Sequence, residues 1–514
     1  MKKYWFWLIV VILCFWFCLF SIEKINFLTA DIGRHIKNGE IFLHSAEFGM
    51  SKWDVLHTNL FSYTYPEFSF VNHHWGSGII AYLIFSIFGF SGLSVTYIVL
   101  LLLALIFALL TVRHDTEVSD IFLAGLFLAP LIADRLEVRP EAISYFFIAF
   151  FIYLLWNYSQ NRMSHKTLFL IPLAELFWVN LHIYFIFGIF IIGIFFFESL
   201  IRKNYIHIKK LFTILVLTCL AAFINPYGFT GVIYPFIIFR NYGYTIVENQ
   251  SIAFLEKLNF IDPSFLWYKI ALVLILISLV LFFLKNRKKI PISLTIISLT
   301  FAVLAYLGIR SISVFALVSL PLLAYSIHSI RNSFKISKDT ILFFQGIISF
   351  GIIVFALFNF SGRLPWNRNF GLGVLPGAFD SSDFIKQNNI QGPIFNNYDI
   401  GSSIDFTLFP QEKAFVDNRP EAYPAEFFSD VYIPMQENPD AFAQVDSRYH
   451  FNAIYFYRLD MTPWGQQFLV AMVKNPDWAP VYVDAETIIF LKRNSQNQNI
   501  ISKYELPKNM FSVS

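Results

Sequence analysis

YWFWLIVVILCFWFCLF, residues 4–20, is an unbroken apolar run that directly follows Lys2 and Lys3. An α-helix needs about 20 apolar residues to cross the hydrocarbon core of a bilayer, with a range of roughly 17–25. No small-residue cleavage site of a signal peptide follows the run in residues 21–24. We therefore expect an uncleaved first membrane helix whose basic end lies in the cytoplasm.

Runs of the same kind recur along the first 360 residues. They are residues 78–112, 119–133, 140–157, 168–180, 184–200, 211–224, 264–284, 291–307, 313–329 and 341–358. Together with residues 4–20 they predict about eleven membrane helices. The run 78–112 is too long for one straight span at about 1.5 Å per residue. Its segment Phe88-Gly89-Phe90-Ser91-Gly92 predicts either a helix turn or a re-entrant pair.

The composition agrees with a polytopic membrane protein. The 514 residues are 56% hydrophobic and only 14% charged, whereas soluble domains carry about 25% charged residues. An aromatic content of 19% excludes disordered and fibrous chains. A net charge of +3 gives no reason to expect a nucleic acid as a partner.

Basic clusters between the apolar runs predict the orientation. They lie at residues 162–166, 202–210, 285–289 and 331–338, and the positive-inside rule assigns all four to the cytoplasm. The opposite side then holds the first outer loop, residues 21–77, and the polar tail after about residue 360. In the tail, residues 393–398, 413–419, 453–459 and 480–493 read as strands, and 380–389, 424–435 and 463–474 as helices.

The predicted fold is an all-α polytopic membrane domain, residues 1–360, that includes the first outer loop, followed by a small α/β extracytoplasmic domain, residues 361–514. Apart from the basic clusters, the ionisable residues at helix ends lie almost wholly on the outer side. Ionisable groups at membrane depth are functional candidates, and a shared side lets them converge on one cavity. The candidates are Asp31 and His35 for catalysis, and Asp54, His57, His73, His74, Trp75, Arg139, Glu141, Asn180, His182, Glu248 and Arg310 for substrate and donor contacts.

Spacing and residue type leave several roles open. Asp31 and His35 are four residues apart and share a helix face, so they could act as general base and orienting partner or as ligands of a divalent metal ion. The alternative is an amphipathic helix lying on the bilayer surface. Arg139 and Arg310 could each hold a phosphate or extend to the interface. Asn180 and His182 could equally cap a helix, and Trp75 could stack on a sugar or belong to the interfacial aromatic belt.

The order of the outer motifs resembles the GT-C superfamily of integral-membrane glycosyltransferases, as found in bacteria. The motifs are Asp31 with His35 and Gly39-Glu40, Asp54, Phe61-Ser62-Tyr63-Thr64, His74-Trp75, Arg139-Pro140-Glu141, Trp178-Val179-Asn180-Leu181-His182, Asn225-Pro226-Tyr227-Gly228, Glu248, Arg310, Asn397-Tyr398-Asp399-Ile400-Gly401, Phe415-Val416-Asp417-Asn418-Arg419 and Trp478 with Val481-Tyr482. Each motif is short, and together they cover nearly the whole chain.

The resemblance implies transfer of a sugar from a polyprenyl phosphate or pyrophosphate donor to a lipid, glycan or protein acceptor. It implies a multi-pass protein of the bacterial inner membrane, with the N-terminus cytoplasmic and the tail extracytoplasmic. In such enzymes an acidic residue of the first outer loop is the general base, which corresponds to Asp31, and basic residues hold the donor phosphate, which correspond to Arg310 and Arg139. Many of them carry a pair of acidic residues there, whereas Asp31 precedes Ile32 and Gly33, so metal dependence stays open. A transporter of lipid-linked glycans and a non-catalytic membrane scaffold are the competing functions.

Overall fold

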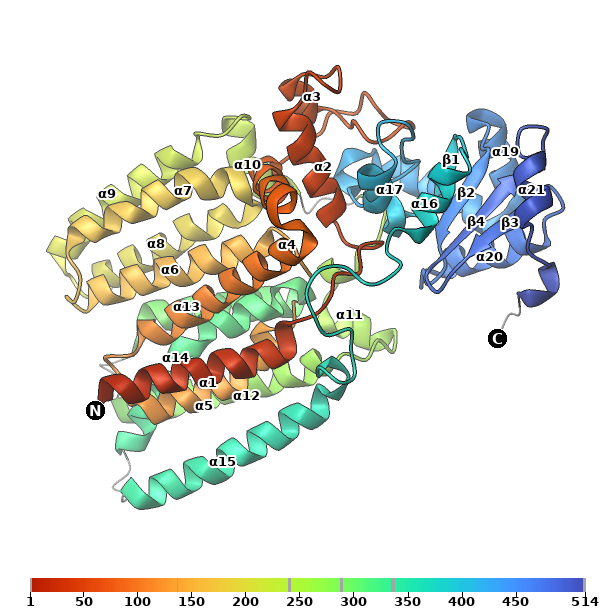
Figure 1. Ribbon diagram of the computed structural model, residues 1–514. Helices are drawn as coiled ribbons and strands as arrows, with labels where there is room; N and C mark the ends of the chain where they lie inside the picture. The colour runs from red at the N-terminus through yellow and green to blue at the C-terminus, as the bar shows by residue number, and fades with distance from the viewer. Residues whose placement is uncertain (1, 136, 239–241, 287–289, 334–337, 512–514) are drawn as a thin grey trace. The chain divides into compact units, whose positions relative to one another are not determined.

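The structure is a computed structural model that describes residues 2–135, 137–238, 242–286, 290–333 and 338–511 (Figure 1). Its contacts divide the chain into two compact units. The helical unit comprises Met1–Lys24, Ser94–Pro235 and Thr245–Leu372, and the α/β unit comprises Ile25–Leu93, Phe236–Tyr244 and Gly373–Ser514. The contacts thus join the first outer loop to the tail in one unit, while the boundary expected at residue 360 stays a prediction.

Helices, most of them long and apolar, make up most of the chain from residue 75 to 359, together with α1. They are α1 (Lys2–Ser21), α4 (Trp75–Thr111), α5 (Val118–Ile132), α6 (Glu141–Ser159), α7 (Leu170–Leu181), α8 (Ile186–Ile201), α9 (Tyr205–Ala222), α10 (Phe229–Ile237), α11 (Ile252–Lys257), α12 (Pro263–Asn286), α13 (Ile292–Leu307), α14 (Ile312–Ser333) and α15 (Lys338–Asn359). Among the described residues, 8 helices are long and apolar enough to cross a membrane. The chain is therefore a multi-pass membrane protein. All the apolar runs of the sequence fall on helices, but α5, α7 and α13 are too short to count among the 8, so the number of about eleven crossings is not confirmed.

The long run 78–112 forms α4, which is two helical segments joined by a kink at Gly89. Gly89 has φ 62° and ψ −162°, a conformation that a residue with a Cβ atom rarely adopts. The backbone therefore changes direction there within one element, which supports the helix turn predicted at this segment.

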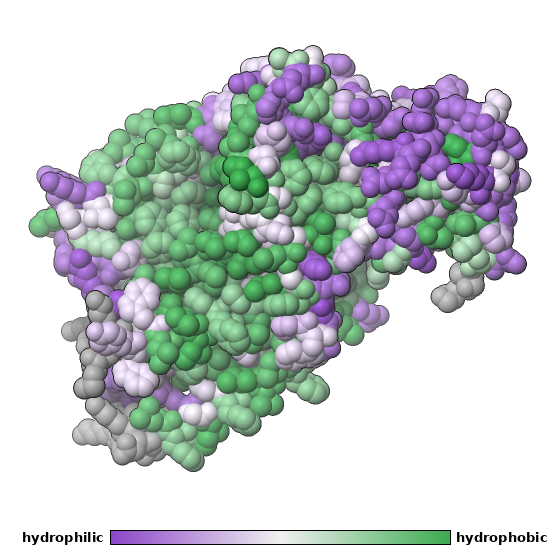
Figure 2. Space-filling view, viewed as in Figure 1, coloured by the Kyte–Doolittle hydropathy of each residue, from purple (hydrophilic) through white to green (hydrophobic). Residues whose placement is uncertain are grey.

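Burial within the helical unit separates packed helices from lipid-facing ones. α14 packs against α5, α12 and α13, and 78% of its apolar window is buried. α1 and α15 both pack against α5, but only 6% of the window of α15 is buried. Apolar side chains that stay exposed over whole helix faces are stable only in lipid. Figure 2 shows this apolar surface over the helices and a largely polar surface over the tail.

A four-stranded sheet organises the α/β unit. Its strands are β1 (Ile394–Asn396), β2 (Ala453–Tyr457), β3 (Trp478–Val483) and β4 (Thr487–Lys492), in the order β1-β2-β4-β3. β1 runs parallel to β2, with Phe395 opposite Ile454, and β4 runs antiparallel to both of its neighbours. The expected strand 480–493 is thus a hairpin. The expected strand 413–419 is wrong: that segment makes only an isolated bridge from Ala414 to Ser62, because its polar side chains pair among themselves instead of extending along a neighbour.

Helices cover both faces of this sheet. They are α16 (Asp380–Gln387), α17 (Gly401–Thr407), α18 (Pro434–Glu437), α19 (Pro439–Tyr449), α20 (Pro463–Lys474) and α21 (Gln498–Tyr504). Of the helices in the first outer loop, α2 (Ile32–Leu43) packs against α17, and α3 (Lys52–His57) packs against α2. Side chains alternate along β2, so Phe456 enters one buried cluster and Tyr455 the other. The first outer loop supplies Phe70 to the first cluster and Leu28 to the second. The loop is therefore part of the core of this unit.

Candidate functional site

The helical unit gathers five of its ionisable side chains in one cluster. Arg135 and Arg139 lie between α5 and α6, and Glu141 begins α6. Glu248 lies in the short turn Val247–Asn249, and Arg310 lies in the turn Ile309–Ser311 between α13 and α14. Four of the five were expected from the sequence, since all of them are at helix ends. Arg135, which connects the others, is also an ionisable residue at an expected outer helix end, but the sequence alone assigned it no role.

Arg135 is the centre of this arginine cluster. Its Nε donates to Glu141 Oε2 at 2.8 Å, and its Nη2 donates to Glu248 Oε2 at 2.6 Å. Arg139 Nη1 reaches the other oxygen of Glu248 at 2.6 Å, and Arg310 Nη2 reaches Glu141 Oε1 at 3.1 Å. The two carboxylates therefore bridge three guanidinium groups. The Glu141 side chain is only 5% exposed and that of Arg135 15%, so the network lies largely out of water.

The electrostatics of the cluster leave one cation in excess among its buried members. Burial opposes ionisation of Glu248, but Arg135 and Arg139 outweigh burial and hold the pKa of Glu248 below its ordinary value. Arg139 also pairs with Glu137, whose side chain is 49% exposed, so water screens its charge. A buried site with surplus guanidinium charge favours an anion, and guanidinium groups match the geometry of phosphate oxygens.

His182 and Asn180 make structural contacts within the helical unit. His182 Nδ1 lies 2.8 Å from Ser144 Oγ, which also accepts from Trp178 Nε1 at 2.8 Å. Asn180 Nδ2 donates to the carbonyl oxygens of Leu176 and Ile224, each at 2.9 Å. Asn180 thus ties the end of α7 to the segment after α9, and His182 is fixed in one ring orientation.

In the α/β unit, the start of α2 brings together a second set of candidates. Asp31 is the N-cap residue of α2, and the backbone of His35 donates to its carbonyl oxygen at 3.2 Å. The rings of His35 and His74 meet edge to face, with centroids 5.2 Å apart. α2 packs against α17 and buries most of its residues. α2 is therefore a packed helix of this unit, and its position relative to the bilayer stays a prediction.

The remaining candidates of the first outer loop have local roles. Asp54 closes a capping box at the start of α3, accepting from Ser51 N at 2.8 Å. The ring of His57 lies against Trp53, with centroids 3.6 Å apart. His73 Nδ1 donates to the carbonyl oxygen of Val71 at 3.2 Å. Trp75 begins α4 and contacts the ring of Phe42.

The residues present do not fit a divalent metal ion held by the protein alone. No group of three or more His, Cys, Asp or Glu side chains in the described ranges is placed to hold one. Asp31 and His35 thus have no third side chain of these types placed beside them within that part of the chain, whereas zinc sites use three or four protein ligands.

The tail contributes polar groups beside α2 that sequence reasoning missed. The Arg34 backbone donates to Ser402 Oγ at 3.0 Å, and the Arg34 side chain is buried. Asp405 of α17 is buried without a hydrogen-bond partner, and burial followed by the charge of Asp417 raises its pKa. Asp417 pairs with Arg419. The position of Arg34 between Asp31 and His35 was the one signal that could have revealed it.

Asp399 is a further perturbed carboxyl group in the α/β unit. Burial, and then the charge of Asp460, raise the pKa of Asp399 to about 7. Tyr398 next to it stacks on Tyr244, with ring centroids 4.5 Å apart. A carboxyl group whose pKa lies near neutrality can exchange a proton under physiological conditions.

Comparison with known proteins identifies solved structures with a similar fold. No family model matches the sequence, and no curated protein matches it. The archaeal oligosaccharyltransferase AglB from Archaeoglobus fulgidus, solved with an inhibitory peptide and a dolichol-phosphate, superposes with a TM-score of 0.62 over 96% of this chain and 75% of that chain, at 13% sequence identity. The two chains share a fold.

Two further structures of the oligosaccharyltransferase from Archaeoglobus fulgidus give the same result. The apo form has a TM-score of 0.58 at 12% identity, and the complex with Zn and sulfate has a TM-score of 0.55 at 12% identity. They cover 96% and 94% of this chain, and 75% and 73% of their own chains. The three superpositions show a shared fold, and membership of the GT-C superfamily stays a prediction.

Proposed function

We propose that this protein is a membrane glycosyltransferase that moves a sugar from a polyprenyl phosphate or pyrophosphate donor to a lipid, glycan or protein acceptor. The observation that carries the proposal is the buried cluster of Arg135, Arg139 and Arg310 at the ends of membrane helices, in a chain with the fold of a glycosyltransferase. The similar archaeal enzyme was solved with a dolichol-phosphate, a ligand of the same chemical class as the proposed donor.

The chemistry follows from the charges. The acceptor hydroxyl oxygen attacks the anomeric carbon of the donor sugar and forms the new bond, while the bond from that carbon to the phosphate oxygen breaks. The leaving phosphate keeps the electron pair, and fixed guanidinium groups such as Arg310 and Arg139 stabilise its charge. Asp31 takes the acceptor proton as general base, and His35 one helical turn away orients it. Attack opposite the leaving group inverts the anomeric centre.

Four other candidates would support the donor site or contact the sugar. Glu141 and Glu248 hold the arginines in place through the contacts at 2.6–3.1 Å described above. His74 and Trp75 offer a ring edge and a ring face to a sugar. We place the reaction on the extracytoplasmic face of a bacterial inner membrane, because the basic clusters of the sequence predict that orientation.

The test is transfer by membranes that contain the full-length protein. A polyprenyl phosphate donor with a radiolabelled sugar is added, and release of the sugar into lipid, glycan or protein fractions is measured. We expect Asp31→Asn to lower the rate by about 100-fold or more, as loss of a general base does. Asp440→Asn, an exposed tail residue, is the matched control and should keep the wild-type rate.

The outcomes separate the competing functions. Full transfer by Asp31→Asn rejects the assignment of the base. A wild-type protein that consumes none of a panel of polyprenyl-linked donors rejects the enzyme class. Movement of intact donor between the two leaflets without consumption would instead identify a transporter.

A further inference from the structure

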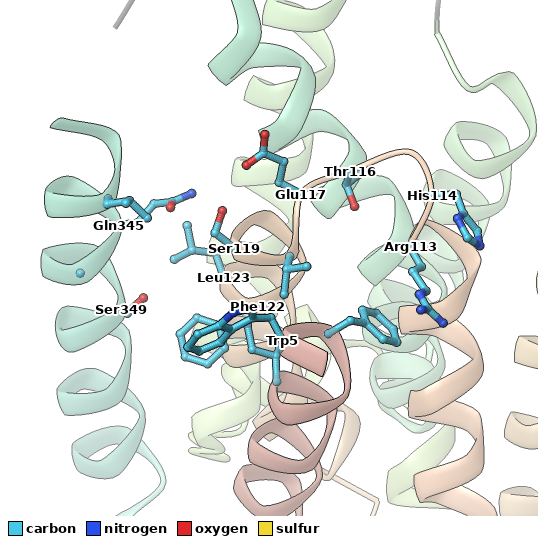
Figure 3. A pocket seen from close by; sticks show the side chains of 15 residues that line it. Trp5, Arg113, His114, Thr116, Glu117, Ser119, Phe122, Leu123, Gln345 and Ser349 are labelled. Carbon is cyan, nitrogen blue, oxygen red and sulfur yellow. The ribbon is translucent and has the colours of Figure 1, made fainter. Parts of the chain in front are cut away.

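Polar side chains outside the proposed reaction gather in a cavity of the helical unit and at a contact between two helices of the α/β unit. The cavity has a volume of about 840 Å³, and its lining includes Glu117, Ser119 and Gln345 (Figure 3). Its acidic residue is already paired, because Arg331 contacts Glu117 at 3.3 Å. The contact between α2 and α17 differs, because its buried acid has no such partner within the described residues.

α2 and α17 lie side by side and approach each other closely (Figure 1). A Cβ atom added at Gly33 would lie 2.8 Å from the carbonyl oxygen of Ser402, so the two backbones are nearly in contact. The Arg34 backbone donates to Ser402 Oγ at 3.0 Å. Arg34 lies between Asp31 and His35 in the sequence. A shift of this contact would therefore move the helical turn that carries the proposed base.

Polar atoms on both sides of the contact are buried without a hydrogen-bond partner in the described part of the chain. On α2 they are Arg34 Nε and Asn38 Nδ2, which share a helix face because they are four residues apart. On α17 they include both carboxyl oxygens of Asp405, a residue that is only 1% exposed. Asp405 lies three residues after Ser402 and thus on the side of α17 that faces α2. Two donors and one acid therefore meet in the same contact without pairing.

The charges that act on Asp405 come from α2 and from the segment after α17. Burial, and then the charge of Asp417, raise the pKa of Asp405. Arg419 and Arg34 act in the opposite direction, but burial and Asp417 prevail. Arg419 is held by other groups, since its Nε donates to Asp417 at 2.8 Å and its Nη2 donates to Asn59 at 2.6 Å. Arg34 is thus the cation that can still move toward an ionised Asp405.

Other charged side chains near α17 do not help Asp405 to ionise. Lys37 of α2 pairs with Glu40 at 2.7 Å. Asp399, in the turn before α17, and Glu421, two residues after Arg419, are acids, so a negative charge on either opposes a second one on Asp405. A buried carboxylate without hydrogen bonds is strongly disfavoured. Asp405 is therefore neutral in the packing that the structure shows.

We propose that Asp405 is a positioning residue for Asp31 and His35. Neutral Asp405 leaves the first turn of α2 where the structure has it. When the pH rises, the Asp405 carboxyl group gives its proton to water, pairs with Arg34 and Asn38, and draws that turn out of place. The effect on transfer rests on the proposed function, whereas the movement of α2 does not.

The first test is the pH dependence of transfer by membranes that contain the full-length protein. We expect the wild-type kcat to fall about tenfold per pH unit in the alkaline range, as for loss of an essential protonated group, with an unchanged KM for the donor. Asp405→Asn, which stays neutral, should lose this decline. Arg34→Gln should move the decline to higher pH, because it removes a cation that favours the carboxylate. Asp383→Asn, an exposed acid of α16, is the matched control and should keep the wild-type profile.

The second test measures α2 without an assay of transfer. Hydrogen exchange of residues 31–43 in the purified full-length protein is compared between the wild type and Asp405→Asn at each pH, so that the intrinsic pH dependence of amide exchange cancels. We expect exchange in the wild type to become about tenfold faster than in the variant at the alkaline end of the series.

The two tests separate this proposal from the proposed function. If the protein consumes no donor but its α2 loosens in the wild type alone, the link between Asp405 and α2 is supported and the transferase is rejected. Equal exchange in the wild type and Asp405→Asn across the pH series overturns the positioning role, and so does an alkaline decline of kcat that persists in Asp405→Asn. Should Asp405→Asn fail to fold, a decline that Arg34→Gln leaves at the wild-type pH overturns the role equally.

Discussion

Arg135 is the residue whose removal tests the arginine cluster most directly. Arg135→Gln deletes its contacts with Glu141 at 2.8 Å and with Glu248 at 2.6 Å. Glu141 then keeps only Arg310 as a cationic partner within the cluster, and Glu248 keeps only Arg139. The neutral amide cannot balance either carboxylate, and both side chains stay largely buried.

The burial of the Arg135 ion pairs determines how much folding stability Arg135→Gln should lose. Breaking a buried ion pair by removing one partner destabilises a protein by about 3–5 kcal/mol. The Arg135 side chain is 15% exposed and that of Glu248 22%, so water relieves part of this loss and the lower end, about 3 kcal/mol, applies. At about 2.1 cal/mol/K of unfolding entropy per residue, a chain of 514 residues shifts by about 1 °C per kcal/mol, so the melting temperature should fall by roughly 3 °C.

Thermal unfolding of the detergent-purified protein, followed by intrinsic fluorescence, measures the effect. Arg202→Gln is the matched control, because Arg202 also pairs with a glutamate at a helix end but its side chain is 45% exposed. That variant should lose less than about 1 kcal/mol. If Arg135→Gln unfolds at the same temperature as Arg202→Gln, the cluster does not stabilise the helical unit as its contacts imply.

Two further predictions concern the α/β unit. Because the pKa of Asp399 is raised from 3.8 to about 7, the neutral form favours folding below pH 3.8, and this contribution is lost as the pH rises through about 7. In the wild type, the hydrogen-exchange protection of residues 394–407 in the intact chain should therefore decline over that pH range. Asp399→Asn should remove the decline. If protection falls with pH at the same slope in both proteins, the raised pKa of Asp399 is contradicted. At Gly39 an added Cβ would lie 2.1 Å from the carbonyl oxygen of Gly78, so Gly39→Ala should lower stability by about 1–3 kcal/mol. Gly193→Ala is the control, because its Cβ meets nothing within 4 Å, and it should be neutral or stabilising in the same melting assay. Equal melting temperatures of Gly39→Ala and Gly193→Ala would show that α2 and α4 can move apart without loss of stability.

Local signals made much of the fold predictable from the sequence. Each apolar run is a helix because hydropathy over a short window reports directly on burial in lipid. The helix expected at residues 463–474 has those bounds in the structure, since Thr462 caps it and Pro463 begins it. The prediction of a strand at 413–419 was wrong because the apolar residues of this segment are buried in a loop, where its polar side chains form hydrogen bonds with each other.

The candidate sites were harder to predict because they depend on contacts distant in sequence. Arg139, Glu141, Glu248 and Arg310 could be grouped in advance, since all were expected at outer helix ends. The central role of Arg135 depends on the orientation of one side chain toward two carboxylates, which no spacing in the sequence encodes. The packing of α2 on α17 likewise joins segments about 370 residues apart, and no periodic pattern reports such a contact.

The shared cores of the α/β unit have a consequence for how the protein is made. Leu28 and Phe70 are buried among side chains of the tail, so the segment 25–93 leaves the ribosome long before its packing partners exist. During membrane insertion of the intervening helices these apolar side chains must stay protected, either by chaperones or by the bilayer surface. A tail produced alone, from residue 373 onward, would in turn lack part of both cores and is expected to aggregate. Maturation of this unit is therefore a late event that awaits the end of synthesis, and truncated chains should be degraded rather than accumulate as soluble tails.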